Sequence, residues 1–388
     1  MSDVAPALVC RRIRLRQFRN FAQLELEFPT AGVAVIGDNG SGKTNLLESL
    51  YYLEIFRSFR GATDEQLVRF GETVFHIRGW FEDAASGDAF EITAAYDARA
   101  RTKRVTVNGS EPAKLSEAIG LVRAVVFSPS DMAIVAGAPS ERRRFLDIVL
   151  SVNRPGYLAR LQRYRHVLRQ RNAALRAGRG FELVEAWNPA FIEAGASIIA
   201  ERASWIASHA EGFARRYRSV GDGAEARLEY RAGLRLGEVD AGDERAVVDA
   251  FAAEADRLAD RERDRGITLI GPHRDDLLIA TPADEGEVDL RDFGSGGQLR
   301  TAAIALRMVE AESIRESRGS APLVLLDDVF AELDPGRSRR ILQMLEAEGH
   351  GQVILTAPKE SDVDLRNAAG SIGGLGRWSI AGGRITGG

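Results

Sequence analysis

Cysteine and histidine are scarce in this chain of 388 residues, which contains one cysteine, Cys10, and five histidines. A single cysteine excludes a disulfide within the chain and is typical of a reducing compartment. The same scarcity argues against a structural zinc site, which needs a cluster of such ligands. No stretch approaches the about 18 apolar residues of a membrane-spanning helix. Arginines interrupt the apolar core that an N-terminal signal peptide would need. We therefore expect a cytoplasmic protein.

Neither sign of charge dominates, because 52 basic residues stand against 56 acidic ones and give a formal net charge of −4. The total charge therefore argues neither for nor against a nucleic-acid ligand, and any basic surface must be local. Lysine is rare, with four among the 52 basic residues, so the chemistry of each lysine is of interest. At roughly 150 residues per domain, the length predicts two or three domains.

Apolar patterning predicts an α/β core near the N-terminus. Residues 9–28 alternate polar and apolar side chains and predict two strands joined by a tight turn. The run Val33–Ile36 is continuously apolar and bounded by glycines, which is typical of a strand buried on both faces. Leucines at helical spacing follow in residues 45–56, and residues 74–127 alternate again as strands do.

Long helical periodicity replaces the strand signals near residue 140. Asn188-Pro189 is expected to begin one of these long helices. After Gly266 the α/β pattern returns, with buried strands at Leu323–Leu326 and Val353–Thr356. We therefore predict one α/β domain built from both ends of the chain, with a mostly helical arm inserted between them. The predicted boundaries are 1–139 for the N-terminal part, 140–265 for the arm and 266–388 for the C-terminal part.

The segment from Gly37 to Thr44 fits the pattern G-x-x-x-x-G-K-[ST]. Its glycines let backbone N–H groups close around phosphates at the N-terminus of the helix that follows. Lys43 is expected to reach the β- and γ-phosphates of ATP, and Thr44 to hold Mg²⁺. The predicted ATP-binding residues of this loop are Gly37, Asp38, Asn39, Gly40, Ser41, Gly42, Lys43, Thr44 and Asn45.

The strand Leu323–Leu326 ends in two acids, Asp327 and Asp328. A buried strand that delivers a carboxylate to its C-terminal end is typical of the Mg²⁺ ligand in nucleotide-binding α/β folds. We assign Asp327 to the metal side. Asp328 is the predicted catalytic residue, which would position or deprotonate the attacking water.

Small residues with free N–H groups open the helix that begins after Ser295, and they predict a second anion site. The predicted ATP-binding residues there are Ser295, Gly296, Gly297 and Gln298. The alternative is a flexible turn with an ordinary helix cap.

These three elements, in this order, resemble the ATP-binding-cassette (ABC) class of ATPases. The resemblance implies that the Ser-Gly-Gly-Gln motif of one subunit closes over ATP held by the P-loop of another, so that ATP drives formation of a homodimer. The long interval between Lys43 and Ser295 leaves room for a helical arm. This arrangement is similar to the SMC branch with very short arms, which implies an ABC/SMC-type ATPase domain.

The resemblance extends to the RecF family of DNA repair proteins and covers essentially the whole chain. The most specific marker is Gly271–Leu277, in which we interpret His273 as a structural residue. The other matching stretches are Phe18–Asn20, Gly37–Asn45, Phe56–Arg60, Phe127–Met132, Arg142–Asp147, Gln170–Asn172 and Leu326–Asp334. Within the last stretch, Ala331 departs from the serine that is usual in the family.

This resemblance implies an ATP-dependent DNA-binding switch in recombinational repair and replication. It implies DNA, RecR and RecO as partners, indirect action on RecA at single-strand gaps, support of the SOS response, and ATP with Mg²⁺ as cofactors. Asp328 replaces the catalytic glutamate of general ABC ATPases, and Thr356-Ala357-Pro358 stands where their switch histidine is expected. Both departures indicate slow hydrolysis, which suits a switch better than a motor.

The segment from Arg154 to Arg179 contains eight arginines and no acid, which predicts a local basic footprint for DNA. The alternative for this segment is a plainly solvated helix. No base-reading module is recognisable, so contacts to the DNA backbone are expected. A short-armed SMC-like architectural clamp remains an alternative function. The predicted DNA-binding residues are Arg57, Arg60, Arg142, Arg143, Arg160, Arg163, Arg169 and Arg171.

Overall fold

The computed structural model describes residues 7–177, 181–284, 286–330, 335–349, 351–360 and 374–387. The chain forms two compact units. The first unit contains Met1–Asp131, Ser219–Gly221 and Leu306–Gly388, and the second contains Met132–Arg218 and Asp222–Ala305. Within the described residues, no helix has both the length and the apolar character needed to cross a membrane.

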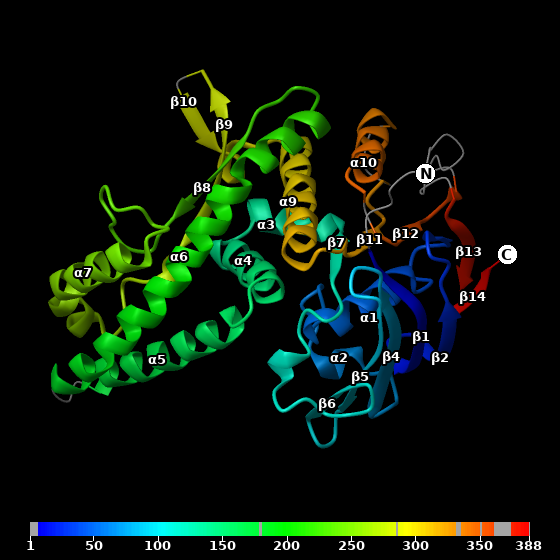
Figure 1. Cartoon of the computed structure of the whole chain (residues 1–388), viewed down its shortest axis with the longest axis horizontal. Helices are drawn as coiled ribbons and strands as arrows, with labels where there is room; N and C mark the ends of the chain where they lie inside the picture. The colour runs from blue at the N-terminus through cyan, green and yellow to red at the C-terminus, as the bar shows by residue number, and fades with distance from the viewer. Residues whose placement is uncertain are drawn as a thin grey trace. The chain divides into compact units, whose positions relative to one another are not determined.

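The strands of the first unit are β1 (Leu8–Phe18), β2 (Phe21–Glu27), β3 (Gly32–Ile36), β4 (Val74–Asp83), β5 (Asp88–Asp97), β6 (Thr102–Val107), β7 (Ala124–Phe127), β11 (Leu323–Asp327), β12 (Val353–Ala357), β13 (Gly376–Ala381) and β14 (Arg384–Gly387). Its helices are α1 (Lys43–Ile55), α2 (Asp64–Leu67) and α10 (Pro335–Ala347). Figure 1 shows the course of the chain through these elements.

One sheet of the first unit has the order β14-β13-β3-β12-β11-β7, with parallel pairing from β13 to β7. The central strands β3, β12 and β11 are almost entirely buried, as the continuous apolar runs predict. Two strands from the C-terminal part of the chain therefore lie beside β3 from its N-terminal part. This pairing brings the ends of β3 and β11 to the same edge of the sheet.

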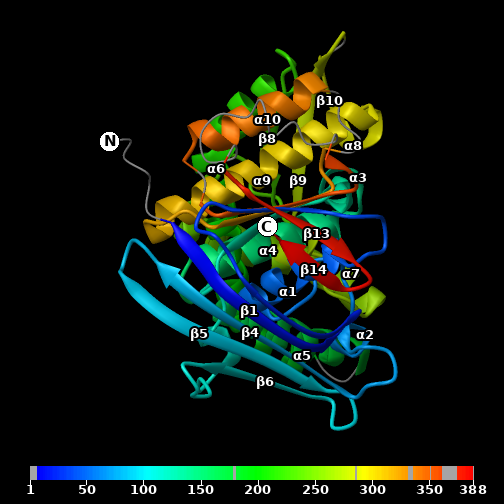
Figure 2. The same ribbon diagram turned by 90° about the vertical axis from the view of Figure 1, so that its right-hand side faces the viewer.

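The second sheet of this unit is antiparallel, with the order β2-β1-β4-β5-β6 (Figure 2). The prediction of two strands in residues 9–28 is confirmed, because β1 and β2 pair with Phe18 opposite Phe21. Arg19, in the turn between them, has φ +53°. Helix α1 packs against strands of both sheets, and most of its residues are buried. The helix that follows the phosphate-binding loop is therefore held on two sides.

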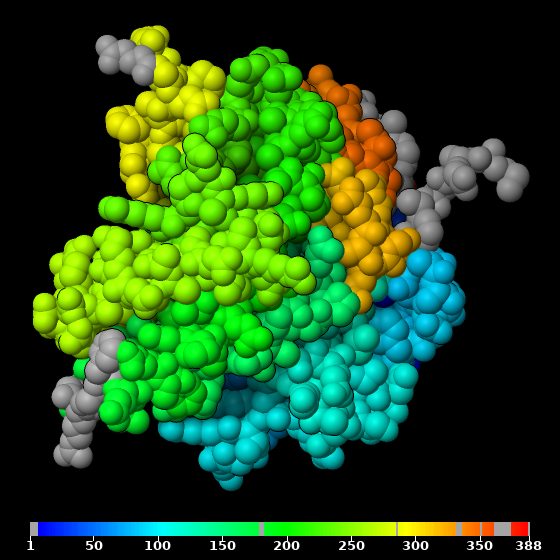
Figure 3. Space-filling model, turned by 60° about the vertical axis from the view of Figure 1, so that its left-hand side comes forward, coloured from blue at the N-terminus to red at the C-terminus, as the bar shows by residue number. Residues whose placement is uncertain are grey.

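The second unit is mostly helical. Its helices are α3 (Met132–Ala136), α4 (Pro139–Asn153), α5 (Tyr157–Ala177), α6 (Phe181–Val220), α7 (Glu244–Arg265), α8 (Leu290–Phe293) and α9 (Gly296–Arg318), of which α6 and α9 run on into the first unit. A three-stranded sheet of β8 (Arg227–Arg231), β9 (Asp276–Ala283) and β10 (Gly286–Asp289) completes it. Figure 3 shows the surface that α5, α6 and α7 form, in green to yellow-green.

Two details of this unit differ from the sequence-based expectations. Pro189 lies inside α6 and does not begin a helix, since α6 starts at Phe181. The second unit also extends to Ala305, beyond the predicted end of the arm at residue 265. The reason lies in long-range contacts: β9 pairs with β8, and Arg142 on α4 forms an ion pair with Asp276 on β9.

Candidate nucleotide-binding site

The loop between β3 and α1 has the backbone of a phosphate-binding loop. Gly40 and Gly42 have φ values of +81° and +113°, which L-residues with side chains rarely adopt. Lys43 is 3% exposed, and its Nζ donates hydrogen bonds to the carbonyl oxygens of Gly37 at 2.6 Å and Asp38 at 3.2 Å. The ammonium group is thus drawn into the loop at the positive end of α1, where phosphate oxygens bind.

Asn20 supports this loop from the turn between β1 and β2, and it was not among the predicted ATP-binding residues. Its Nδ2 donates to the carbonyl of Ser41 at 3.1 Å, and its Oδ1 accepts from Asn45 Nδ2 at 2.8 Å. A Cβ atom at Gly42 would lie 2.4 Å from Asn20 Nδ2. A side chain at position 42 would therefore displace this amide from its two hydrogen bonds, in addition to the strain that the φ of +113° imposes on it.

The carboxylate at the end of β11 lies directly against the start of α1. Thr44 Oγ1 donates a 2.8 Å hydrogen bond to Asp327 Oδ1, although the two residues are 283 positions apart. Asp327 is 6% exposed, and burial raises the pKa of its carboxyl group above the ordinary range. A hydroxyl beside a carboxylate is an oxygen donor set that suits Mg²⁺, which takes one or two protein ligands together with phosphate oxygens. Thr44 and Asp327 therefore fit the predicted metal position.

Asp328, the next residue, has an unusual backbone and a neighbour on β12. Its φ is +48°, and its N–H donates to Thr356 Oγ1 at 3.1 Å. The same hydroxyl lies 3.0 Å from Asp327 Oδ1. Thr356 stands near the expected position of the switch histidine, and here it contacts both acids. Its hydroxyl fixes the backbone from which the Asp328 side chain projects.

Ser295 belongs to the second unit, whereas the loop that contains Lys43 belongs to the first. Its N–H donates to Gln298 Oε1 at 2.8 Å, and its Oγ accepts from the Gln298 N–H at 3.3 Å, which forms a capping box on α9. Ser295 and Gly296 are exposed, and so is Phe293, at 73%. The motif is thus both a helix cap and a surface feature.

The predicted DNA-binding arginines lie in three places, which are the segment after α1, helix α4 and helix α5. Arg57 and Arg60 are exposed just after α1, and Arg60 donates to Asn45 Oδ1 at 3.4 Å. On α5, Arg163 is 60% exposed beside Glu193, whereas Arg160 is partly covered and pairs with Glu201. Arg169 is exposed on the same helix, and Arg143 on α4 is half-buried.

Arg142 and Arg171 are corrections to that prediction, because their guanidinium groups lie inside the second unit. Arg142 is 2% exposed and donates to both carboxylate oxygens of Asp276. Arg171 is 1% exposed and donates to Asn188, Thr268 and Glu262. A buried arginine needs such partners because an unpaired charge is costly in the interior. These two side chains hold the fold and are not surface contacts.

Arg171→Ala is expected to lower the free energy of unfolding by about 3–5 kcal/mol, because it leaves the fully buried carboxylate of Glu262 unpaired. Arg169→Ala, two positions away and exposed, should change it by less than about 0.5 kcal/mol. Urea denaturation of the full chain measures both values. Equal stability of the two variants would contradict the structural role of Arg171.

The first unit has a parallel sheet with a P-loop before α1, and at the end of β11 an aspartate that is hydrogen-bonded to Thr44. With the antiparallel sheet and the helical insertion, this arrangement defines an ABC/SMC-type ATPase fold. Residues 9–369 match the family model described as RecF/RecN/SMC N terminal domain. The solved structure of the Smc head domain of Pyrococcus furiosus supports the fold, with a TM-score of 0.55 at 15% identity. The match covers 98% of this chain and 96% of that one.

More similar relatives specify the family. The DNA replication and repair protein RecF of Moorella thermoacetica is 35% identical over 90% of this chain and 90% of its own length. RecF of Salinibacter ruber is 34% identical over 91% and 85%. The solved structure of the recombination mediator protein RecF-ATP in the RecFOR pathway has a TM-score of 0.87 at 29% identity and covers 100% of this chain and 99% of that one. The chain belongs to the RecF family.

Proposed function

We propose that this protein is an ATP-dependent DNA-binding protein of recombinational repair and replication, with slow ATP hydrolysis. ATP drives formation of a homodimer on single-stranded, gapped or junction DNA, and the dimer supports RecA loading and SOS induction together with RecR and RecO. The observation that carries the ATPase part is the 2.8 Å contact between Thr44 and Asp327. RecF structures that include ATP support the choice of nucleotide.

Five side chains at the site have roles in the proposed reaction. Lys43 and the loop N–H groups bind the phosphates, while Thr44 and Asp327 hold Mg²⁺, which neutralises phosphate charge when bound. Asp328 orients the attacking water and accepts its proton. The Thr356 hydroxyl keeps Asp328 in place by accepting a hydrogen bond from the Asp328 backbone N–H. Aspartate is one methylene shorter than glutamate, so its carboxylate lies farther from the attacking water. This greater distance is consistent with slow turnover.

Asp328→Asn is expected to keep ATP affinity within about threefold and to lower the hydrolysis rate about 100-fold or more, because an amide cannot accept the proton. Asparagine tolerates the φ of +48° at this position, so the backbone should be retained. Single-turnover hydrolysis and equilibrium ATP binding measure the two effects. The control is Asp328→Glu, which keeps a proton acceptor. An Asp328→Asn protein that hydrolyses ATP at the original rate would assign the base to another residue.

The proposed DNA contact rests on the exposed arginines of α5 that lie outside the buried network. Replacing both Arg163 and Arg169 with Glu should weaken DNA binding and reduce the slope of log affinity against log salt by about 0.9 for each phosphate that is no longer neutralised. Fluorescence anisotropy with a gapped duplex at several salt concentrations measures this. ATP binding should be unchanged.

A matched control changes charge equally on another helix of the same unit. Arg215 and Arg218 on α6 are 60% and 56% exposed, so their double replacement with Glu introduces the same charge. We expect this control to bind DNA more tightly than the α5 variant at every salt concentration. Equally weakened binding in both proteins would mean that net charge matters and that α5 is not the DNA contact.

A further inference from the structure

A cavity of about 260 Å³ lies within the second unit, between α4, α5, α6 and the short turn Pro272–Arg274. Its lining residues come from all four of these elements. They are Ser140, Arg143, Arg144, Asp147, Leu161, Tyr164, Arg165, Leu168, Arg202, Pro272 and His273. A water molecule takes about 30 Å³ of liquid, so this cavity has room for a group of several non-hydrogen atoms.

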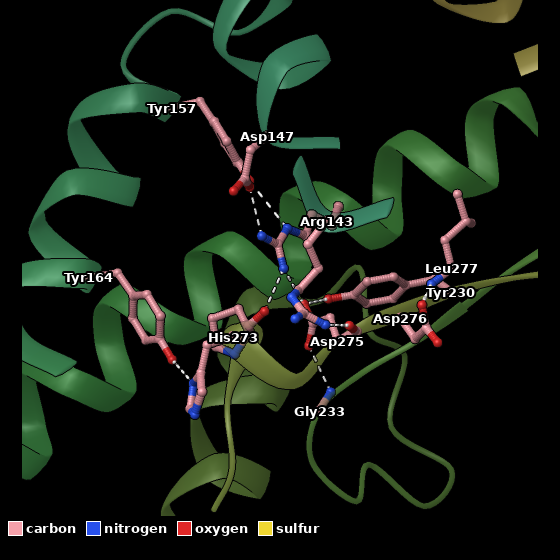
Figure 4. A network of polar contacts seen from close by, with 12 residues as sticks. Arg143, Asp147, Tyr157, Tyr164, Tyr230, Gly233, His273, Asp275, Asp276 and Leu277 are labelled. Atoms are coloured by element: carbon pink, nitrogen blue, oxygen red, sulfur yellow. Dashed lines mark hydrogen bonds and ion pairs between the residues drawn. The ribbon is translucent and has the colours of Figure 1, made fainter. Parts of the chain in front are cut away.

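The acids near the cavity are already bound by neighbouring side chains (Figure 4). Asp147 accepts hydrogen bonds from Tyr157 at 2.8 Å, Arg202 at 2.7 Å and Arg165 at 2.9 Å. Asp275, behind the wall and 0% exposed, accepts from Arg202 at 2.7 Å and from the Tyr230 hydroxyl. Both carboxylates therefore stabilise the buried Arg202.

Three further arginines at the cavity retain donor capacity. Arg143 donates one bond, at 2.7 Å, to the carbonyl oxygen of Asp275, and burial lowers the pKa of its guanidinium group. Arg165 contacts Asp147 through one nitrogen and is 53% exposed. Among the contacts of the described residues, Arg144 has no hydrogen bond or ion pair, and it is exposed. A guanidinium group carries five N–H donors, so many of them remain available to a ligand.

The charges of the cavity do not balance. Four arginines line it, and the two carboxylates that touch them, Asp147 and Asp275, leave an excess of two positive charges. His273 adds none near neutral pH, because burial lowers its pKa to about 4. The His273 Nδ1 lies 2.6 Å from the Tyr164 hydroxyl. The part of the cavity lining that these two residues form is therefore uncharged, and their side chains hold each other in position.

Three of the lining residues are apolar. Leu161 and Leu168 each lie about one turn from Tyr164 along α5, on either side of it, and Pro272 begins the turn opposite. An anion of inorganic size needs only the arginines, whereas a ligand with an organic part could also pack against these side chains. The cavity therefore combines a charged side and an apolar side, as small-molecule sites do.

We propose that this cavity binds a phosphate group that carries about two negative charges, supplied either by a small phosphate monoester or by free inorganic phosphate. A phosphate monoester carries close to two negative charges at neutral pH, which equals the excess of the cavity, and guanidinium forks match phosphate oxygens. The DNA backbone is a poorer fit, because each internal phosphodiester carries one charge and must continue on both sides. This site is separate from the P-loop and does not depend on the proposed ATPase activity.

The test uses the full chain with the P-loop impaired by Lys43→Ala, so that phosphate binding there is strongly weakened. Calorimetric titration with AMP and with inorganic phosphate distinguishes an organic ester from free phosphate as the source. Adding Arg144→Gln and Arg165→Gln should weaken binding of either probe about tenfold or more. Both side chains are exposed, so these changes should leave the fold intact. The control is Arg215→Gln, an exposed arginine of α6 outside the cavity.

Saturable binding of either probe that the cavity variants weaken and the control does not would support the proposal. Tighter binding of AMP than of phosphate would identify the organic ester, and the reverse order would identify free phosphate. Absence of binding to the Lys43→Ala protein would overturn the proposal. So would cavity variants that bind both probes normally but lose affinity for duplex DNA, since the arginines would then form a nucleic-acid surface.

Discussion

Lys43→Ala is expected to reduce ATP affinity about 100-fold or more. Lys43 is the one lysine of the loop, and two charge-assisted hydrogen bonds to phosphate oxygens contribute about 1.5–3 kcal/mol each. The ammonium is already held at the loop by the carbonyls of Gly37 and Asp38, so positioning it costs little. Equilibrium dialysis or fluorescence titration with labelled ATP measures the change.

The control for this variant is Lys114→Ala, which removes an exposed lysine far from the loop in sequence. It should bind ATP as the unchanged protein does. A thermal melt must show that Lys43→Ala remains folded, since this side chain is buried in the structure. An affinity within threefold of the unchanged protein would contradict the assignment of residues 37–44 as the phosphate-binding loop.

The residues that can be identified from sequence are those whose chemistry depends on local spacing. The glycines and Lys43 lie within one short segment, and a buried strand precedes them, so the loop is recognisable without a structure. Asp327 follows the same logic, at the end of an apolar run. Asn20 and Thr356 are different, because each acts on the site from another strand or turn. Single polar residues of this kind carry no spacing pattern of their own. The family resemblance marks both positions, but only the tertiary contacts show what each side chain does there.

The arginines of the arm show the opposite problem. A count of charges along α5 cannot distinguish Arg171 from Arg163 and Arg169, yet Arg171 is buried and the other two are exposed. Its partner Glu262 lies 91 positions away on α7, and no local signal connects the two. Helical spacing could place Arg171 on the face that contains Tyr164, but only the tertiary contacts identify its partners.

Ser295→Arg is expected to keep ATP binding and to abolish ATP-induced dimerisation. In the proposed dimer, Ser295 of one protomer faces the nucleotide held by Lys43 of the other, and a long cationic side chain would obstruct that interface. Sedimentation velocity with a slowly hydrolysed ATP analogue measures the dimer.

The capping role of Ser295 requires a control, because the same change removes the hydroxyl that accepts from the Gln298 N–H. Removing a serine cap costs about 1 kcal/mol, so Ser295→Ala should destabilise the helix start equally. It introduces no bulk, and it should therefore dimerise more readily than Ser295→Arg. Equal defects in the two variants would assign the effect to the missing hydroxyl, and normal dimerisation of Ser295→Arg would contradict the composite site.

Mixing the two large-effect variants separates the halves of that site. Ser295→Arg protein has an intact loop at Lys43, whereas Lys43→Ala protein has an intact Ser-Gly-Gly-Gln motif. A mixed dimer would therefore contain one complete ATP site, formed by the loop of the first chain and the motif of the second, and one site defective in both halves. We expect the mixture to recover at most half of the hydrolysis of the unchanged protein, while each variant alone has almost none. Because complementation requires residues from two chains, a mixture that stays inactive although both proteins are folded would mean that each chain completes its own site.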